Sequence, residues 1–122
     1  EKLLCHFPDT VKILHNDAEA AHLAGAIGDT DFDYWHVGSC IDIQKAREDS
    51  HGKITLIGGL DPIREVAKLP PESLYDTAVK RLEAMGGDDR MILSAGGFVN
   101  YGTSPENIKE VVRAVQEHFK EE

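Results

Sequence analysis

The chain has 122 residues, of which 41% are apolar and 29% charged, a balance typical of one folded domain with a core. Its net charge of −9 argues against a nucleic-acid partner, because phosphate backbones are bound by clustered Lys and Arg. No apolar run approaches the roughly 18 residues that span a bilayer, and no signal-peptide pattern opens the sequence. We therefore expect a soluble, cytoplasmic protein with a single domain over residues 1–122 that binds neither nucleic acid nor membrane.

Four short apolar runs predict β-strands. They lack strict alternation with polar residues, which is typical of parallel strands covered on both faces. The runs cover residues 10–14, 34–37, 54–57 and 91–93. Residues with helical spacing follow each run, at 18–27, 41–49, 71–85 and 105–119, with a further helical turn at 63–68. The chain thus repeats strand, loop and helix four times.

The last two helices have the clearest end signals. The last helix has Ser104 as its N-cap and Pro105 at its first position. Its expected buried face is the stripe Ile108, Val111, Val112, Val115 and Phe119. The helix before it starts near Pro71 and stops at Gly86 and Gly87. Its expected buried face is Leu74, Ala78, Leu82 and Met85.

This order of elements fits two architectures, a small doubly wound sheet and half of a (β/α)8 barrel. A complete barrel needs about 250 residues, so the length favours half a barrel. The chain also starts at Glu1 without a methionine and soon reaches an apolar stretch, which predicts a piece of a longer protein. In both architectures the ligand lies beyond the carboxyl ends of the strands.

His15 and Asp17 follow the first predicted strand. Alternate residues of an extended segment point to one side, so the two are candidate metal ligands or an acid and base pair. The alternative is structural, with a histidine fixed by local hydrogen bonds and an aspartate that caps the next helix. Spacing alone favours the structural interpretation, because a two-residue motif is weak evidence.

Weaker candidates follow the later strands. His36 lies at the end of the second strand and Cys40 follows it, and both residue types are often buried without a role. Cys40 and Cys5 form no CxxC pair and are expected to be free thiols. Asp61, which precedes Pro62, is either a turn cap or a site residue.

Paired glycines follow the third and fourth strands. Gly58–Gly59 and Gly96–Gly97 are either tight turns or places where the backbone approaches a ligand. Neither GxGxxG nor GxxxxGK[ST] occurs, so a nucleotide site is unsupported. The remaining histidines are expected on the surface or in packing: His6, His22, His51 and His118.

The strand ends together resemble the C-terminal half of the uroporphyrinogen decarboxylase superfamily, which also contains corrinoid-dependent methyltransferases. The segments that carry the resemblance are Ile57-Gly58-Gly59-Leu60-Asp61-Pro62, similar to a family motif G-N-x-D-P, then Ile92-Leu93-Ser94-Ala95-Gly96-Gly97, and Thr103-Ser104-Pro105-Glu106-Asn107-Ile108. The resemblance covers essentially the whole chain. It implies an α/β fold with the four βα units of strands 5 to 8 of a (β/α)8 TIM barrel, and a site at the C-terminal mouth.

The resemblance implies two activities. In the decarboxylases a key aspartate lies in the N-terminal half and a histidine follows the eighth strand, where this chain has Gly97. In the methyltransferases a His-x-Cys pair and a later cysteine hold a zinc ion that activates an acceptor thiol. His15 matches the histidine, whereas Asp17 and Gly97 stand where the cysteines are.

We therefore expect a corrinoid-dependent methyltransferase-like enzyme that moves a methyl group between a cobalamin cofactor and a small acceptor. Uroporphyrinogen III decarboxylase is the alternative, and an inactive fragment or binding module is the second. The expected catalytic residues are His15, Asp17 and Asp61, with His15 and Asp17 also as candidate zinc ligands. A replacement third ligand is expected from His36, Cys40 or Asp42. The expected substrate contacts are His36, Gly58, Gly59, Ser94, Gly96 and Gly97.

The half-barrel architecture predicts binding partners. A half barrel exposes one face of its sheet and two strand edges, so we expect pairing with the N-terminal half-barrel or self-association. A small-molecule substrate and a corrinoid protein are further expected partners. A porphyrinogen with many carboxylates needs Arg or Lys at the mouth, and only Arg64 closely follows a strand end.

Overall fold

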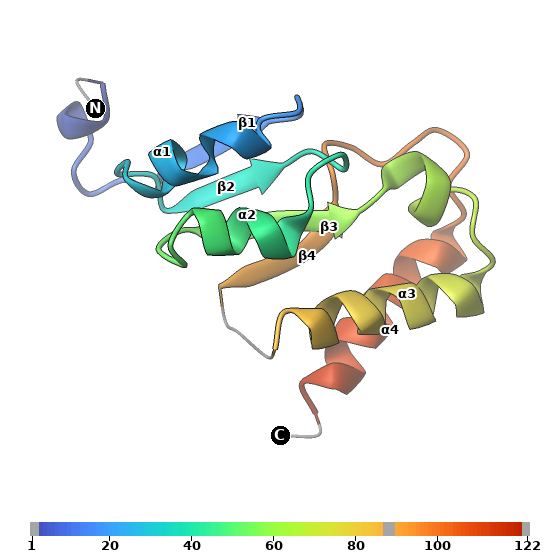
Figure 1. The fold of residues 1–122 in the computed structure, drawn as a ribbon. Coiled ribbons are helices and arrows are strands. Elements are labelled where there is room, and N and C mark those ends of the chain that lie inside the picture. The colour runs from blue at the N-terminus through green and yellow to red at the C-terminus, as the bar shows by residue number, and fades with distance from the viewer. Residues whose placement is uncertain (1–2, 87–89, 121–122) are drawn as a thin grey trace.

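The computed structural model of the chain describes residues 3–86 and 90–120. Strands alternate with helices along the chain (Figure 1). The strands are β1 (Ile13–Asn16), β2 (Tyr34–Val37), β3 (Thr55–Leu60) and β4 (Met91–Ala95). The helices are α1 (Ala24–Gly28), α2 (Ile43–Asp49), α3 (Pro71–Ala84) and α4 (Pro105–His118). Shorter turns are the 3-10 helices η1 (Leu4–His6) and η2 (Ala21–Leu23) and the π-helical turn η3 (Pro62–Val66).

The four strands form a parallel sheet in the order β1-β2-β3-β4. This sequential order is that of a (β/α)8 barrel, whereas a doubly wound sheet reverses its strand order at a switch point. The predicted half-barrel fold is therefore confirmed. Because the strands are parallel, their carboxyl ends meet at one edge of the sheet, where the arrowheads lie in Figure 1.

Helices cover one face of the sheet. Alternate residues of β2 and β3, including Trp35, Val37, Leu56 and Leu60, are fully buried on this face. Figure 1 shows α1 and α2 along it, and buried residues of both helices share a core cluster with Trp35. A second cluster joins the end of β3 to η3, α3 and α4. Two adjoining hydrophobic clusters thus stabilise the sheet, and the second lies at the carboxyl end of β3.

The first helix is shorter than expected. Instead of one helix over residues 18–27, the chain forms η2 and the five-residue α1. The Asn16 side chain accepts a hydrogen bond from the Ala18 backbone N–H at 2.9 Å. This bond forms a turn directly after β1 and delays the helix. β1 also begins later than the predicted range 10–14.

The third and fourth strands run further than predicted. β3 contains Gly58 and Gly59, whose φ angles of +144° and +104° favour glycine. Their backbones still pair with β4, Gly58 with Leu93 and Gly59 with Ser94. These glycines are therefore part of the sheet and not a turn that follows it.

The ends of α3 and α4 match the prediction, but the buried face of α4 does not. Leu74, Ala78 and Leu82 of α3 are buried as expected, and Gly86 follows with φ +69°, while Gly87 lies outside the described residues. In α4 the Ser104 side chain accepts a hydrogen bond from the Asn107 N–H at 3.2 Å. Asn107 and Ala114 are the buried residues of this helix, and Val111 packs against the second core cluster. The rest of the predicted stripe is partly exposed: Ile108 38%, Val112 49% and Phe119 46%.

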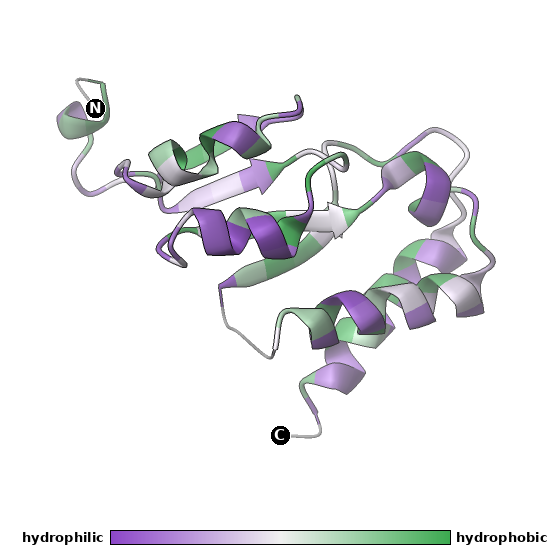
Figure 2. Ribbon diagram, viewed as in Figure 1, coloured by the Kyte–Doolittle hydropathy of each residue, from purple (hydrophilic) through white to green (hydrophobic). Residues whose placement is uncertain are grey.

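Within residues 3–86 and 90–120, no helix is both long and apolar enough to cross a bilayer. The longest helices, α3 and α4, have 14 residues each. Both carry charged residues along their length, which the purple segments of Figure 2 show.

The face of the sheet turned away from the helices is uncovered. His15, His36, Ile57 and Ile92 are in register across the four strands. Ile92 is 46% exposed, and Ile13 in β1 is 56% exposed. Figure 2 shows the apolar character of β4, the last strand of the sheet. In a complete barrel this face is the packed interior.

The loops after β1, β2 and β4 pack closely together because glycine stands at the contacts. A Cβ on Gly38 would lie 2.8 Å from the backbone O of Asp17. A Cβ on Gly96 would lie 2.6 Å from the backbone N of Ser39. A side chain at either position would push the strand ends apart, because backbone atoms cannot rotate away.

We predict that the isolated chain of residues 1–122 forms dimers or larger species at micromolar concentration. The uncovered apolar face and the open edges of β1 and β4 are surfaces that associate. Sedimentation velocity measures the state, and Ile92→Lys on the uncovered face is expected to weaken association. A monodisperse monomer for the unmodified chain contradicts the prediction.

We predict that Gly96→Ala destabilises the protein by about 1–3 kcal/mol, the usual cost of overpacking. Gly25→Ala in α1 is the matched control, because a Cβ there meets its nearest atom at an ordinary 3.5 Å. Alanine in a helix is expected to be neutral or to stabilise by up to about 1 kcal/mol. Urea unfolding of the full-length protein measures both variants, and equal effects contradict the close packing of the strand ends.

Candidate functional site

A hollow of about 510 Å³ lies at the carboxyl ends of the strands. Residues that follow each of the four strands line it, and we call it the strand-end hollow. Its lining residues are Asp17, Ser39, Cys40, Asp61, Pro62, Ile63, Arg64, Gly96 and Phe98. Of the residues predicted from the sequence, Asp17, Cys40, Asp61 and Gly96 line this hollow, whereas His15, His36 and Gly97 do not. Gly58, Gly59 and Ser94 lie within strands and do not line it.

His15 and His36 form a pair across β1 and β2. Their Nδ1 atoms are 3.0 Å apart, and their ring centroids are 4.8 Å apart at an interplanar angle of 54°. At this distance the Nδ1 that carries a hydrogen donates a hydrogen bond to the other Nδ1, which accepts it. His15 is exposed and His36 is half-buried. No hydrogen bond to Nε2 of His15 is found in the described part of the chain.

His36 also reaches the end of β4. Its Nε2 lies 3.3 Å from Ala95 O and 3.3 Å from Gly97 N. β3 lies between β2 and β4 in the sheet, and its residues Gly58 and Gly59 carry no side chain. The His36 ring therefore connects β1 and the end of β4 across the middle of the sheet.

The Asp17 carboxylate lies against Gly97. Both of its oxygens would be 2.8 Å from a Cβ at position 97. The expected cap role of Asp17 is not seen, because the N-cap of η2 is Ala20 and that of α1 is Leu23. Asp17 is exposed, and no hydrogen bond to its carboxylate is found among residues 3–86 and 90–120. Asp17 and His36 thus approach Gly97 from two directions.

Asp61 is a cap. Its Oδ1 accepts hydrogen bonds from the backbone N–H groups of Ile63 at 2.8 Å and Arg64 at 2.7 Å. These bonds, chiefly the one from Arg64, hold the pKa of Asp61 below its usual value. The structure therefore shows Asp61 as a turn cap, which is one of the two roles expected from the sequence. A catalytic role for Asp61 stays a prediction.

The strand-end hollow is acidic. Asp17 and Asp61 supply two carboxylates, and Arg64 is the cation among the described lining residues. An anionic ligand would therefore meet a net repulsive charge here. Within the described residues Cys5 and Cys40 form no disulfide, as predicted, and the exposed Cys40 lies in this hollow.

The residues present do not fit the three-ligand zinc site that the resemblance implies. Nδ1 of His15 is paired with His36, and the Asp42 carboxylate accepts a hydrogen bond from the Lys45 N–H at 3.1 Å. Among residues 3–86 and 90–120, no group of three or more His, Cys, Asp or Glu side chains is arranged to hold a metal ion. Zinc binding by His15 and Asp17 stays a prediction, and no step below uses a metal.

Sequence reasoning missed several residues of the hollow. Ser39, Ile63 and Phe98 line it, and Ile63 and Phe98 are exposed apolar side chains at its rim. Their signal was position alone, because each lies in the segment that follows a predicted strand. Their type carried no chemical hint, since exposed apolar residues are common on protein surfaces.

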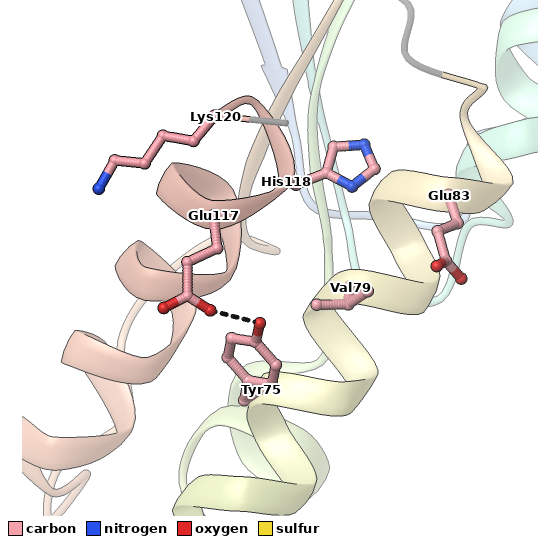
Figure 3. Close-up of a pocket in the computed structure, with 6 residues that line it drawn as sticks. All are labelled: Tyr75, Val79, Glu83, Glu117, His118 and Lys120. Carbon is pink, nitrogen blue, oxygen red and sulfur yellow. Dashed lines mark hydrogen bonds between the residues drawn. The ribbon is translucent and has the colours of Figure 1, made fainter. Parts of the chain in front are cut away.

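A second hollow, of about 360 Å³, lies between α3 and α4 (Figure 3). The Tyr75 hydroxyl donates a hydrogen bond to Glu117 at 2.6 Å, and the Arg113 guanidinium lies 3.9 Å from the Tyr75 ring centroid. The bond to Glu117 raises the pKa of Tyr75 and lowers that of Glu117. Tyr75 of α3 thus contacts Glu117 and Arg113 of α4, and these contacts join the two helices. We assign this hollow a structural role in helix packing.

We predict that Asp61→Ala lowers the free energy of unfolding at neutral pH by about 1 kcal/mol, the usual value of a lost cap. Because the folded-state pKa of Asp61 is lowered, the charged form stabilises the fold above the unfolded value of 3.8. The difference from the unmodified protein should therefore shrink as the pH falls through the acidic range. Urea unfolding at several pH values tests this, with the exposed Asp31→Ala as control. A difference that grows on acidification is the contrary result.

Comparisons with known proteins bear on the family and on the fold of the chain. The family model described as Uroporphyrinogen decarboxylase (URO-D) matches residues 1–118. The chain is 32% identical over 94 residues to the uroporphyrinogen decarboxylase of Paraburkholderia phytofirmans, covering 77% of this chain and 25% of that protein. It is 30% identical over 80 residues to that of Burkholderia mallei, covering 66% and 21%. The chain thus spans about a quarter of the length of the curated relatives it matches.

A solved structure supports the fold. The methyltransferase from Methanosarcina mazei superposes with a TM-score of 0.78 at 22% identity, over 91% of this chain and 32% of that one. At this identity the likeness shows the fold alone. The family match over nearly all of the sequence, together with the sheet order and the strand-end hollow, shows that the chain belongs to the uroporphyrinogen decarboxylase family.

Proposed function

We propose that the chain forms part of the active site of a corrinoid-dependent methyltransferase, which moves a methyl group between a cobalamin cofactor and a small acceptor. The observation that carries this proposal is the charge of the strand-end hollow, two carboxylates against one guanidinium. A porphyrinogen with many carboxylates is recognised by several Arg or Lys side chains. The described residues of the hollow do not supply them.

The acceptor chemistry needs a proton to be moved. Methyl transfer to or from an O–H, N–H or S–H group requires an acid or base at the acceptor atom. In this proposal Nε2 of His15, an exposed residue of β1 outside the lining of the hollow, serves this step together with the exposed carboxylate of Asp17, which lines it. Both side chains work without a metal in this proposal.

In this proposal the macrocycle of cobalamin lies at the rim of the hollow. Phe98 and Ile63 are exposed there, and a macrocycle can rest on such apolar side chains while the hollow itself holds the small acceptor. Cobalamin, when bound, supplies or receives the methyl group. In this proposal the protein acts in the cytoplasm, a corrinoid protein is its partner, and the N-terminal half-barrel completes the site.

Uroporphyrinogen decarboxylation is the second candidate. The observation in its favour is that the curated relatives are named uroporphyrinogen decarboxylases. Under this alternative, cationic residues outside this chain supply the charge that the strand-end hollow lacks. A chain that is inactive alone and works only as a scaffold or binding module is the third candidate, because half a barrel leaves one face of the sheet uncovered.

Two assays on the full-length protein separate the candidates. We predict loss of the methylcobalamin absorbance on addition of a panel of thiol, amine and phenol acceptors, and no CO₂ release from uroporphyrinogen. His15→Ala is expected to slow methyl transfer by about 100-fold or more, the usual contribution of a general acid or base. His22→Ala, on an exposed turn, is the matched control and should retain activity. CO₂ release without methyl transfer contradicts the proposal.

A further inference from the structure

The Asp17 carboxylate has no compensating partner among residues 3–86 and 90–120. Asp17 is exposed and lines the strand-end hollow, and neither a hydrogen bond nor an ion pair joins its carboxylate to another described residue. Its oxygens lie against Gly97, where a Cβ would be 2.8 Å from both of them. Asp17 therefore presents an unpaired negative charge at the wall of the hollow.

The second carboxylate of the hollow, that of Asp61, is compensated within its own turn. Its Oδ1 accepts hydrogen bonds from the backbone N–H groups of Arg64 and Ile63. These bonds, first the one from Arg64, lower the pKa of Asp61, and the positive charge of the Arg64 side chain adds to the effect. Arg64, the cation among the described lining residues, thus acts on Asp61 and forms no ion pair with Asp17. The charge of Asp17 is left in excess.

An aromatic ring lines the same hollow. Phe98 directly follows Gly97, the residue that the Asp17 carboxylate lies against, and the Phe98 side chain is 52% exposed. The face of an aromatic ring attracts a cation through its quadrupole, and a carboxylate attracts the same cation by its charge. A free carboxylate and an aromatic ring on one hollow therefore suit an organic ammonium group.

We propose that the strand-end hollow binds an acceptor that carries a substituted ammonium group, held by the Asp17 carboxylate and the Phe98 ring. This inference deepens the proposed function and rests on it for the reaction, because it names the substrate class of the same site. The ammonium group is the part that is bound, and the methyl group is transferred at another atom of the acceptor. Phe98 then contacts the acceptor on one side of its ring and the macrocycle on the other.

Two other classes of ligand fit the hollow less well. An anionic acceptor meets two carboxylates and, among the described lining residues, one guanidinium. A metal ion needs several ligands, and no group of three or more His, Cys, Asp or Glu side chains in the described part of the chain is arranged to hold one. A small organic cation needs one carboxylate and an apolar surface against its carbon atoms, and the hollow has both.

Choline, a quaternary ammonium alcohol, and 3,3-dimethylbutan-1-ol, its uncharged isostere, test the site without any assay of activity. Each is titrated into the full-length, ¹⁵N-labelled protein in the presence of a chelator, and the amide signals of Gly97 and Phe98 are followed. We expect choline to shift both signals saturably and to bind about fivefold more tightly than the isostere, or better. No binding of choline, or equal binding of the two compounds, overturns the proposal.

Two substitutions separate the local contact from the overall charge of the protein. Asp17→Asn removes a negative charge from the hollow, and Asp31→Asn removes one from an exposed position outside it. We expect Asp17→Asn to weaken choline binding by about fivefold or more, and Asp31→Asn to change it by less than about twofold. Equal effects mean that choline responds only to the net charge of −9, which contradicts the site.

Phe98→Leu tests the aromatic half of the site, because leucine keeps an apolar side chain but has no ring. We expect it to weaken choline binding by about two- to fivefold, the usual size of an exposed cation–π contact, and to leave binding of the isostere unchanged. Unchanged binding of choline in Phe98→Leu overturns the assignment of Phe98.

The titrations contain no cobalamin, so their outcome is separate from that of the methyl-transfer assay. Choline binding that depends on Asp17, without methyl transfer by the full-length protein, refutes the proposed function but supports the ammonium site. Methyl transfer to uncharged acceptors, with no choline binding, supports the proposed function but overturns the ammonium site.

Discussion

Parallel pairing of four consecutive strands is the constraint on which this structure depends. It forces each connection to return over one face of the sheet, so the helices bury that face and leave the other uncovered. It also brings all the carboxyl ends to one edge. Residues as far apart in sequence as Asp17, Cys40, Asp61 and Phe98 therefore surround a common hollow.

Glycine at the strand ends converts this edge into a close-packed site. Gly38 and Gly96 let the loops after β1, β2 and β4 touch through backbone atoms. Gly97 in turn leaves the space that the Asp17 carboxylate takes up. The same close approach brings Nε2 of His36 within hydrogen-bond distance of Gly97, while Nδ1 of the same ring contacts Nδ1 of His15. The site chemistry thus follows from backbone packing more than from any dense cluster of ligands.

Much of the fold could be predicted from the sequence because apolar runs and helix ends are local signals. The alternating strands and helices and the N-cap at Ser104 follow from such patterns, while half a barrel was favoured by length and a cap at Asp61 was one of two alternatives. The short α1 and the exposed half of the α4 stripe could not be predicted, because they depend on the Asn16 turn and on which neighbour α4 packs against. The pairing of His15 with His36 also has no sequence signal, since it requires the strand register.

The central claim is that the mouth formed by this chain is built for a small acceptor and not for a polycarboxylate. Calorimetric titration of the full-length protein with uroporphyrin, a stable porphyrin with the same carboxylate side chains, tests this most directly. Among the described lining residues Arg64 is the one cation beside two carboxylates, which predicts no saturable binding in the micromolar range. Tight, salt-sensitive binding of uroporphyrin would contradict the account and point to decarboxylation.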